Sequence, residues 1–177
     1  MEFNQFIAVL DTNVLAPMPV ADTLLRLAEE PAFYLPRWSE DILQELERTL
    51  LKWGYTPLQA DRRLGVMRQY FPEALVTGYA GLADSLEVDD KDRHVLACAI
   101  RVGAHAIVFD NQKHFPAKTM GPLGIECLTA GEFLKQQYHM GPDLFIQVLE
   151  SQCADADCTM AELLERLPSE LEELIHF

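Results

Sequence analysis

The sequence has no apolar run that approaches the roughly 20 residues a membrane-spanning helix requires. No basic region precedes the short apolar run near the N-terminus, so this end is not typical of a secretory signal. The four cysteines are scattered, with no CxxC pair and no nearby histidine to suggest a zinc site. A glycine-rich turn of the dinucleotide-binding kind is also missing. These absences predict a globular protein of a reducing cytoplasm, with no membrane segment.

Basic residues are few, since 14 Lys and Arg stand against 28 Asp and Glu, and the net charge is −14. The acidity is uneven: residues 136–177 contain one basic residue and nine acids, whereas residues 1–135 contain 13 basic and 19 acidic residues. This balance disfavours a nucleic-acid binder that works without metal. A bound divalent cation would reverse the local sign, so a metal-dependent nuclease stays compatible with the composition.

An unbroken apolar run over residues 6–10 stops at Asp11, and Thr12 and Asn13 follow it. Such a run is typical of a strand buried on both faces of a parallel sheet. A carboxylate at the carboxyl end of that strand lies where open α/β sheets place their ligand crevices. The structural alternative is an Asx turn in which Asp11 caps the next segment. A second run, over residues 106–109, ends in the same way, at Asp110 and Asn111.

The remaining pattern alternates strands with helices, which predicts a parallel sheet with right-handed crossovers. Strands are expected at residues 32–35, 75–77 and 124–128. Helices are expected at residues 21–30, 39–53, 57–70, 89–103, 130–137, 143–152 and 160–167. The densest basic patch, interpreted as an ordinary solvated helix face, consists of Arg62, Arg63 and Arg68.

Two helices carry acidic residues of interest. Glu45 borders the apolar stripe of its helix, a position that is usually solvated. Asp89 or Asp90 is suited to be the N-cap of the next helix. Asp92 precedes Val95 and Leu96 by three and four residues, which predicts an inward carboxylate that needs a partner or a metal.

In a parallel sheet the strand ends at Asp11 and Asp110 share one edge, and the helix of Asp92 opens on that edge. Glu45 reaches the same crevice if its helix leans across it. Carboxylates gathered in one crevice repel each other, and Mg²⁺ or Mn²⁺, which prefer oxygen ligands, would relieve this repulsion. The chemistry suited to such a site is metal-assisted hydrolysis of a phosphodiester.

Four segments resemble the PIN-domain family, particularly the VapC-type ribonuclease toxins of bacterial toxin–antitoxin pairs. They are Leu10-Asp-Thr-Asn-Val-Leu15, Ser39-Glu-Asp-Ile-Leu-Gln-Glu45, Asp89-Asp-Lys-Asp-Arg-His-Val-Leu-Ala97 and Ile107-Val-Phe-Asp-Asn-Gln-Lys-His-Phe-Pro116. With Gly131-Glu-Phe-Leu134 they stand in family order. The resemblance implies a three-layer α/β/α sandwich with a central parallel sheet. A PIN-like nuclease domain over residues 1–138 would precede a C-terminal helical extension over residues 139–177.

Carried over by position, the resemblance implies catalytic and metal-binding roles for a set of acids. The catalytic set is Asp11, Glu45, Asp92 and Asp110, and the metal-binding set adds Asp89, with Asp90 as its alternative. The side chains expected to orient ligands or substrate are Thr12, Asn13, Ser39 and Asn111. The fourth acidic position departs from the family pattern, because Asp110 is offset by one residue and His114 stands in place of an acid. This departure leaves open whether Asp110 or Asn111 fills that position, and whether one metal or two bind.

The resemblance therefore implies a Mg²⁺- or Mn²⁺-dependent endoribonuclease with an RNA substrate, an antitoxin protein as partner and a homodimeric state. The alternative is a catalytically degenerate PIN fold that serves as a binding module. A haloacid-dehalogenase-like phosphatase fits less well, because it needs a second Asp two positions after the first, where this chain has Asn13. A phosphorylated receiver domain also fits poorly.

Overall fold

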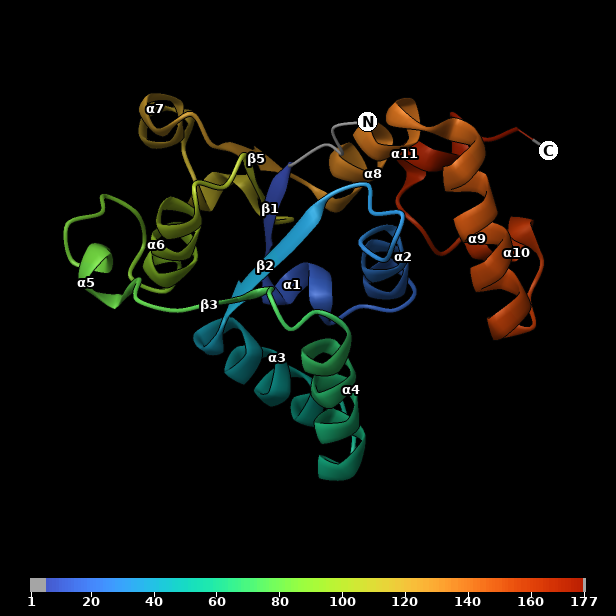
Figure 1. Cartoon of the computed structure of the whole chain (residues 1–177), viewed down its shortest axis with the longest axis horizontal. Coiled ribbons are helices and arrows are strands. Elements are labelled where there is room, and N and C mark those ends of the chain that lie inside the picture. The colour runs from blue at the N-terminus through green and yellow to red at the C-terminus, as the bar shows by residue number, and fades with distance from the viewer. Residues whose placement is uncertain (1–5, 177) are drawn as a thin grey trace.

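The computed structural model describes residues 6–176, so residues 1–5 and 177 of the predicted domains lie outside the described residues. Five parallel strands form one sheet in the order β3-β2-β1-β4-β5 (Figure 1). They are β1 (Ile7–Leu10), β2 (Leu35–Ser39), β3 (Leu75–Val76), β4 (Ala106–Val108) and β5 (Glu126–Leu128). The first strand of the chain is thus the central strand of the sheet.

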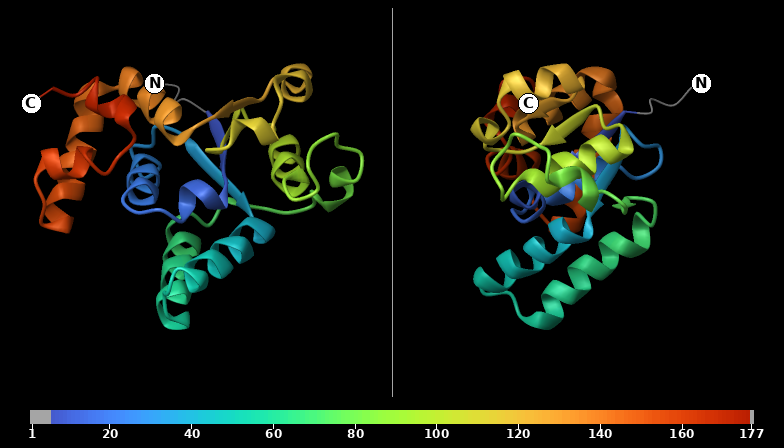
Figure 2. Two further views of the ribbon diagram at one scale, coloured as in Figure 1. Left: turned by 180° about the vertical axis from the view of Figure 1, so that it is seen from behind. Right: turned by 90° about the vertical axis from the view of Figure 1, so that its left-hand side faces the viewer.

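Helices cover both faces of this sheet, which confirms the predicted three-layer α/β/α architecture. They are α1 (Thr12–Leu15), α2 (Val20–Leu27), α3 (Glu40–Lys52), α4 (Pro57–Tyr70), α5 (Ala80–Ala83), α6 (Arg93–Val102), α7 (Ala117–Met120), α8 (Ala130–Met140), α9 (Pro142–Ala156), α10 (Met160–Leu164) and α11 (Ser169–Glu172). Figure 1 shows α6 on one side of the strands and α2 and α8 on the other. The α3–α4 hairpin projects beyond the carboxyl ends of the strands, as the view from behind in Figure 2 also shows. None of the described helices has the length and apolar character needed to cross a membrane.

The strand predicted at residues 32–35 was placed too early, because β2 runs from Leu35 to Ser39. Pro36 and Arg37 interrupt the apolar pattern but fit this strand. The amide of Leu35 points toward β1, where it donates to the carbonyl of Phe6, so Pro36 faces the β3 side. Since β2 pairs with β3 only from Trp38 onward, the missing N–H of Pro36 removes no hydrogen bond from the sheet.

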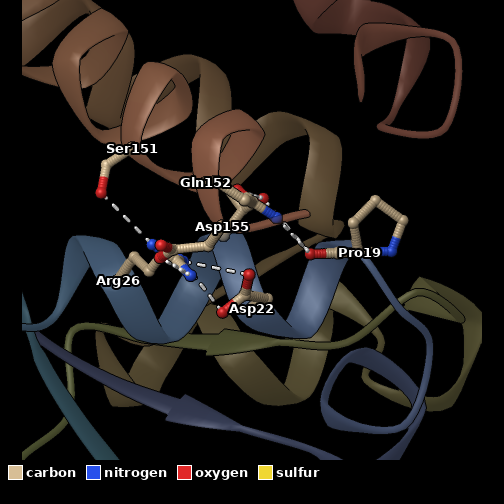
Figure 3. Close-up of polar contacts among 7 residues, drawn as sticks. Pro19, Asp22, Arg26, Ser151, Gln152 and Asp155 are labelled. Carbon is tan, nitrogen blue, oxygen red and sulfur yellow. Dashed lines mark hydrogen bonds and ion pairs between the residues drawn. The ribbon is translucent and has the colours of Figure 1, made fainter. Parts of the chain in front are cut away.

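The C-terminal helices pack on the same chain. Gln152 of α9, 1% exposed, donates to the carbonyl of Pro19 and accepts from the hydroxyl of Thr23 on α2 (Figure 3). Arg26 of α2 pairs with Asp155 of α9 at 2.9 Å (Figure 3). The apolar side chains buried beyond residue 140 are Phe145, Leu149, Cys153, Leu163, Leu164, Leu167, Leu171 and Ile175. The boundary between residues 138 and 139 stays a prediction, but the helices after it belong to the same apolar core.

Candidate active site

Asp11 lies at the carboxyl end of the central strand β1 and is 5% exposed. It is the N-cap of the short helix α1, and its Oδ2 accepts from the amide of Asn13 at 3.4 Å. Burial raises the pKa of this carboxyl from 3.8 to about 6, and the negative charge of Glu45 acts in the same direction. The amides of Thr12 and Asn13 and the nearby His94 act in the opposite direction. Asp11 therefore caps a helix and is also a buried, destabilised carboxylate, while its place in a ligand site stays a prediction.

The residues that follow Asp11 connect the site to its neighbours. The hydroxyl of Thr12 donates to the carbonyl of Ile42 in α3 at 3.1 Å, and the hydroxyl of Ser39 accepts from the amide of Ile42 at 3.2 Å. Asn13 accepts from the backbone amide of Asp110 at 3.4 Å, so it links the ends of β1 and β4. In this arrangement Thr12 and Ser39 position α1 and α3, and Asn13 is the predicted orienting residue that contacts Asp11.

Glu45 reaches the site from α3, as its place at the border of the apolar stripe allows. Its Oε1 lies 3.0 Å from Nε2 of His94, which belongs to the first turn of α6. Burial lowers the pKa of His94, but the hydrogen bond to Glu45 and the charges of Glu45, Asp11 and Asp41 together raise it by more. The net pKa of His94 is therefore above its ordinary value. This ion pair brings α3 and α6 together beside Asp11.

Asp92 is 7% exposed, as its spacing to Val95 and Leu96 predicts. It stands one residue before α6 and is the N-cap of that helix, so the expectation that Asp89 or Asp90 is the N-cap was wrong. The carbonyl of Asp89 accepts the amides of Asp92 and Arg93 in a turn that leads into the helix. The carboxylate of Asp92 accepts from His114 instead, with Oδ2 2.6 Å from Nδ1.

The other predicted acids, unlike Asp11 and Asp92, are exposed. Asp110 is exposed, and its Oδ1 accepts from the amide of Ala130 at the start of α8, at 3.0 Å. Asp89 is exposed, and Asp90 forms an ion pair with Arg93 at 2.9 Å. Asn111 bonds to His114 across 2.8 Å. The position after β4 thus contributes Asn111 and His114 near Asp92, while the carboxylate of Asp110 is engaged by α8.

One residue of the basic patch differs from the rest. Arg63 is half-buried and donates to the carbonyls of Leu15 and Ala16, at 3.0 Å for Ala16, so it caps the end of α1 rather than forming part of a solvated face. Arg68 pairs with the carboxylate of Glu40 and is exposed. Arg63 therefore supports the helix that Asp11 begins.

Sequence reasoning predicted no contact between a histidine and these carboxylates, although it noted His114 in place of an acid. His94 is 49 positions from Glu45, and no local pattern connects the two residues. His114 follows Asn111 by three residues in a turn of 3₁₀ helix, Gln112–His114, and the spacing of these two polar residues was the only available signal. Within residues 6–176 no three His, Cys, Asp or Glu side chains converge closely enough to hold a metal ion. The donor atoms of Asp11, Glu45 and Asp92 suit Mg²⁺ or Mn²⁺ chemically, but histidines hold two of these carboxylates.

No protein-family model matches the chain. The crystal structure of VapBC2 from Rickettsia felis bound to a DNA fragment from their promoter is similar at a TM-score of 0.48 and 21% identity, over 68% of this chain and 97% of that chain. The chain is also 42% identical over 64 residues to "Putative ribonuclease VapC50" of Mycobacterium tuberculosis strain H37Rv. That match covers 36% of this chain and 38% of the length of that relative. The 64-residue match to a protein named VapC50 confirms the resemblance to VapC-type proteins that the motifs predict.

Proposed function

We propose that this chain is a Mg²⁺- or Mn²⁺-dependent endoribonuclease and the toxin of a toxin–antitoxin pair. The observation that carries the proposal is Asp11, a buried carboxylate at the end of the central strand whose pKa burial raises to about 6. A carboxylate in such a place destabilises the fold, and groups of this kind gather at functional sites. The similarity to a protein named as a ribonuclease supports the same activity.

Asp11, Glu45 and Asp92 are the residues that would hold the metal. Their oxygen atoms suit a hard divalent cation, and Asp11 forms no ion pair with a basic side chain among the described residues. When bound, the metal supplies an activated water and stabilises the attacking and leaving oxygens of the phosphodiester. The chain itself orients Asp11 through Asn13 and the α1 turn, while His94 and His114 hold Glu45 and Asp92 in place.

A partner protein is the second part of the proposal. The resemblance implies an antitoxin that inserts a basic side chain into the acidic site, and the net charge of −14 favours a basic partner. A homodimer is proposed on the resemblance alone. The competing function is a non-catalytic binding module, which is favoured by the absence of three converged donor side chains within residues 6–176.

The test is to incubate the purified, partner-free chain with a mixture of structured RNAs, with Mn²⁺ or with EDTA. Asp11→Asn is the matched variant, because it keeps the side-chain acceptor for the amide of Asn13 and removes the charge. We expect cleavage that requires the metal and is lost in Asp11→Asn by a factor of about 10² or more, because removal of a metal ligand abolishes the activated water.

Absence of cleavage for every RNA, together with absence of Mn²⁺ binding in calorimetry, would reject the enzyme and favour the binding module. Cleavage that persists in EDTA would reject the metal requirement alone. An equal rate for Asp11→Asn would show that the nuclease activity does not come from this site.

A further inference from the structure

We propose that His114 is the positioning residue of Asp92, acting as one unit with Asn111. This inference rests on the proposed function, because it concerns how one of the three metal-binding carboxylates is oriented. It goes beyond that function in assigning a role to a neutral side-chain pair at the position where the family resemblance expects an acid. The unit works by presenting a single, defined hydrogen-bond donor to the carboxylate.

The direction of the hydrogen bonds follows from the chemistry of the amide group. Nδ2 of Asn111 lies 2.8 Å from Nε2 of His114. A side-chain amide nitrogen only donates, so we infer that Nε2 of the neutral ring is the acceptor. The proton of the neutral ring is then on Nδ1, which lies 2.6 Å from Oδ2 of Asp92. Asn111 thus selects the one neutral tautomer of His114 that donates to the carboxylate.

The surroundings of His114 keep the ring in this place. The backbone amide of His114 donates to the carbonyl of Asn111 at 3.1 Å, which closes the 3₁₀ turn between them. The ring centroid of His114 lies 5.5 Å from that of Phe109, which is buried at the end of β4. Phe115 packs edge-on against Phe109 at 4.9 Å. Phe109, which precedes His114 in the sequence, contacts the ring, and Phe115, which follows it, packs on Phe109. These contacts anchor the ring to the sheet.

Asp92 depends on this donor. Its carboxylate is buried, and as N-cap of α6 it makes no side-chain capping hydrogen bond. Within the described range, 6–176, the sole side chain that hydrogen-bonds the Asp92 carboxylate is that of His114. The bond engages Oδ2 of the carboxylate. Hydrogen-bond partners of metal ligands orient them, and their removal typically weakens metal binding about 10–100-fold.

The exposed counterpart in this chain is His139, a histidine of α8 that contacts Tyr138 and lies on the surface. His139→Ala is therefore the matched control for the loss of an imidazole. His114→Asn is the conservative variant, because its amide nitrogen can take the place of Nδ1 and donate to Asp92. Asn111→Ala removes the side-chain amide that donates to Nε2 of His114 and keeps the imidazole ring of His114.

The experiment uses the full chain and two readouts other than activity. Long-range ¹H–¹⁵N NMR of the metal-free protein, at a pH where the ring is neutral, reports which nitrogen of His114 is protonated. Titration calorimetry with Mn²⁺ reports affinity for each variant, with circular dichroism to verify that each is folded. We expect the Nδ1–H tautomer in the wild type. We also expect Mn²⁺ affinity to fall about 10–100-fold in His114→Ala, to recover most of that loss in His114→Asn, and to be unchanged in His139→Ala.

Finding the Nε2–H tautomer would overturn the inference, as would wild-type Mn²⁺ affinity in both His114→Ala and Asn111→Ala. If His114→Ala does not fold, Asn111→Ala decides, because wild-type Mn²⁺ affinity together with an unchanged Nδ1–H tautomer in that variant removes the claimed role of Asn111. A wild-type chain that binds no Mn²⁺ would overturn the proposed function itself. Wild-type binding with no difference among the variants would overturn this inference alone.

Discussion

At the scale of single residues, Asp11 has a cost that can be measured in the metal-free protein. Its pKa is raised to about 6 in the folded chain, from 3.8. The folded state therefore binds the proton more tightly than the unfolded state, and this contribution to stability is full below about pH 4 and lost as pH rises through about 6. Above that pH the buried charge destabilises the fold by about 2–3 kcal/mol, since each tenfold difference in proton affinity between the two states corresponds to about 1.4 kcal/mol.

We predict that Asp11→Asn raises the free energy of unfolding by about 2 kcal/mol at neutral pH in EDTA, and that the gain shrinks toward pH 4. The amide keeps the capping interaction with Asn13 and removes the buried charge. Urea denaturation at several pH values measures both effects. Asp61→Asn, at an exposed position of α4, is the control and should show neither. A gain of the same size at every pH would contradict the assignment to the ionised carboxyl.

The same residue shows what local sequence can predict. Asp11 is predictable because a buried strand ends directly before it, and this relation is local. The partners of Glu45 and Asp92 are histidines contributed by α6 and by the turn after β4, 49 and 22 positions away. Only the packing of elements determines such pairs. The direction of Asp110 is equally non-local, because the amide from which it accepts belongs to α8.

At the scale of elements, the sequence predicts the positions of the strands that are unbroken apolar runs, but it does not predict the position of β2. β1 and β4 lie in the middle of the sheet, buried on both faces, so their sequence reports their environment directly. β2 contains Pro36 and Arg37, so its identity as a strand depends on pairing with β1. The composition of residues 89–92 also predicts the start of α6 too early, because several acids there are suited to be the N-cap and the structure uses the last of them, Asp92.

The contact between α2 and α9 provides a test of how the C-terminal helices are held. We predict that Gln152→Ala lowers the free energy of unfolding by about 2–4 kcal/mol, because it removes two buried hydrogen bonds and opens a cavity. One of these hydrogen bonds runs from Gln152 to the Pro19 carbonyl (Figure 3). The other runs from the Thr23 hydroxyl to Gln152. Gln147→Ala, on the exposed face of the same helix, should change stability by less than about 0.5 kcal/mol. Equal effects of the two substitutions in chemical denaturation would argue against this contact.

At the scale of the whole molecule, the acidic C-terminal segment combines a charged surface with a buried apolar face. Residues 136–177 carry nine acids and one basic residue, yet Phe145 and Leu149 are fully buried. Phe145 packs edge-on against Phe33, with ring centroids 6.3 Å apart, and against Tyr138 at 5.7 Å. Sequence periodicity predicts that these helices must bury their apolar side, but it contains no information on which surface they cover.

Because the C-terminal helices pack against residues of the predicted nuclease domain, we expect that residues 1–138 do not form an independent domain. We predict that a chain ending at residue 138 fails to unfold cooperatively or aggregates, because removal of α9 to α11 exposes the apolar surface around Phe33 and removes the buried hydrogen bond from the Thr23 hydroxyl to Gln152. Thermal melts and size-exclusion chromatography measure the outcome. The control is the full chain with Glu150, Glu165 and Glu172, all exposed, replaced by Gln. That variant removes negative charge and keeps the packing, so it should melt cooperatively. If the truncated chain instead melts like the full one, the predicted boundary separates two independent units and the contacts of α9 add little to the nuclease fold.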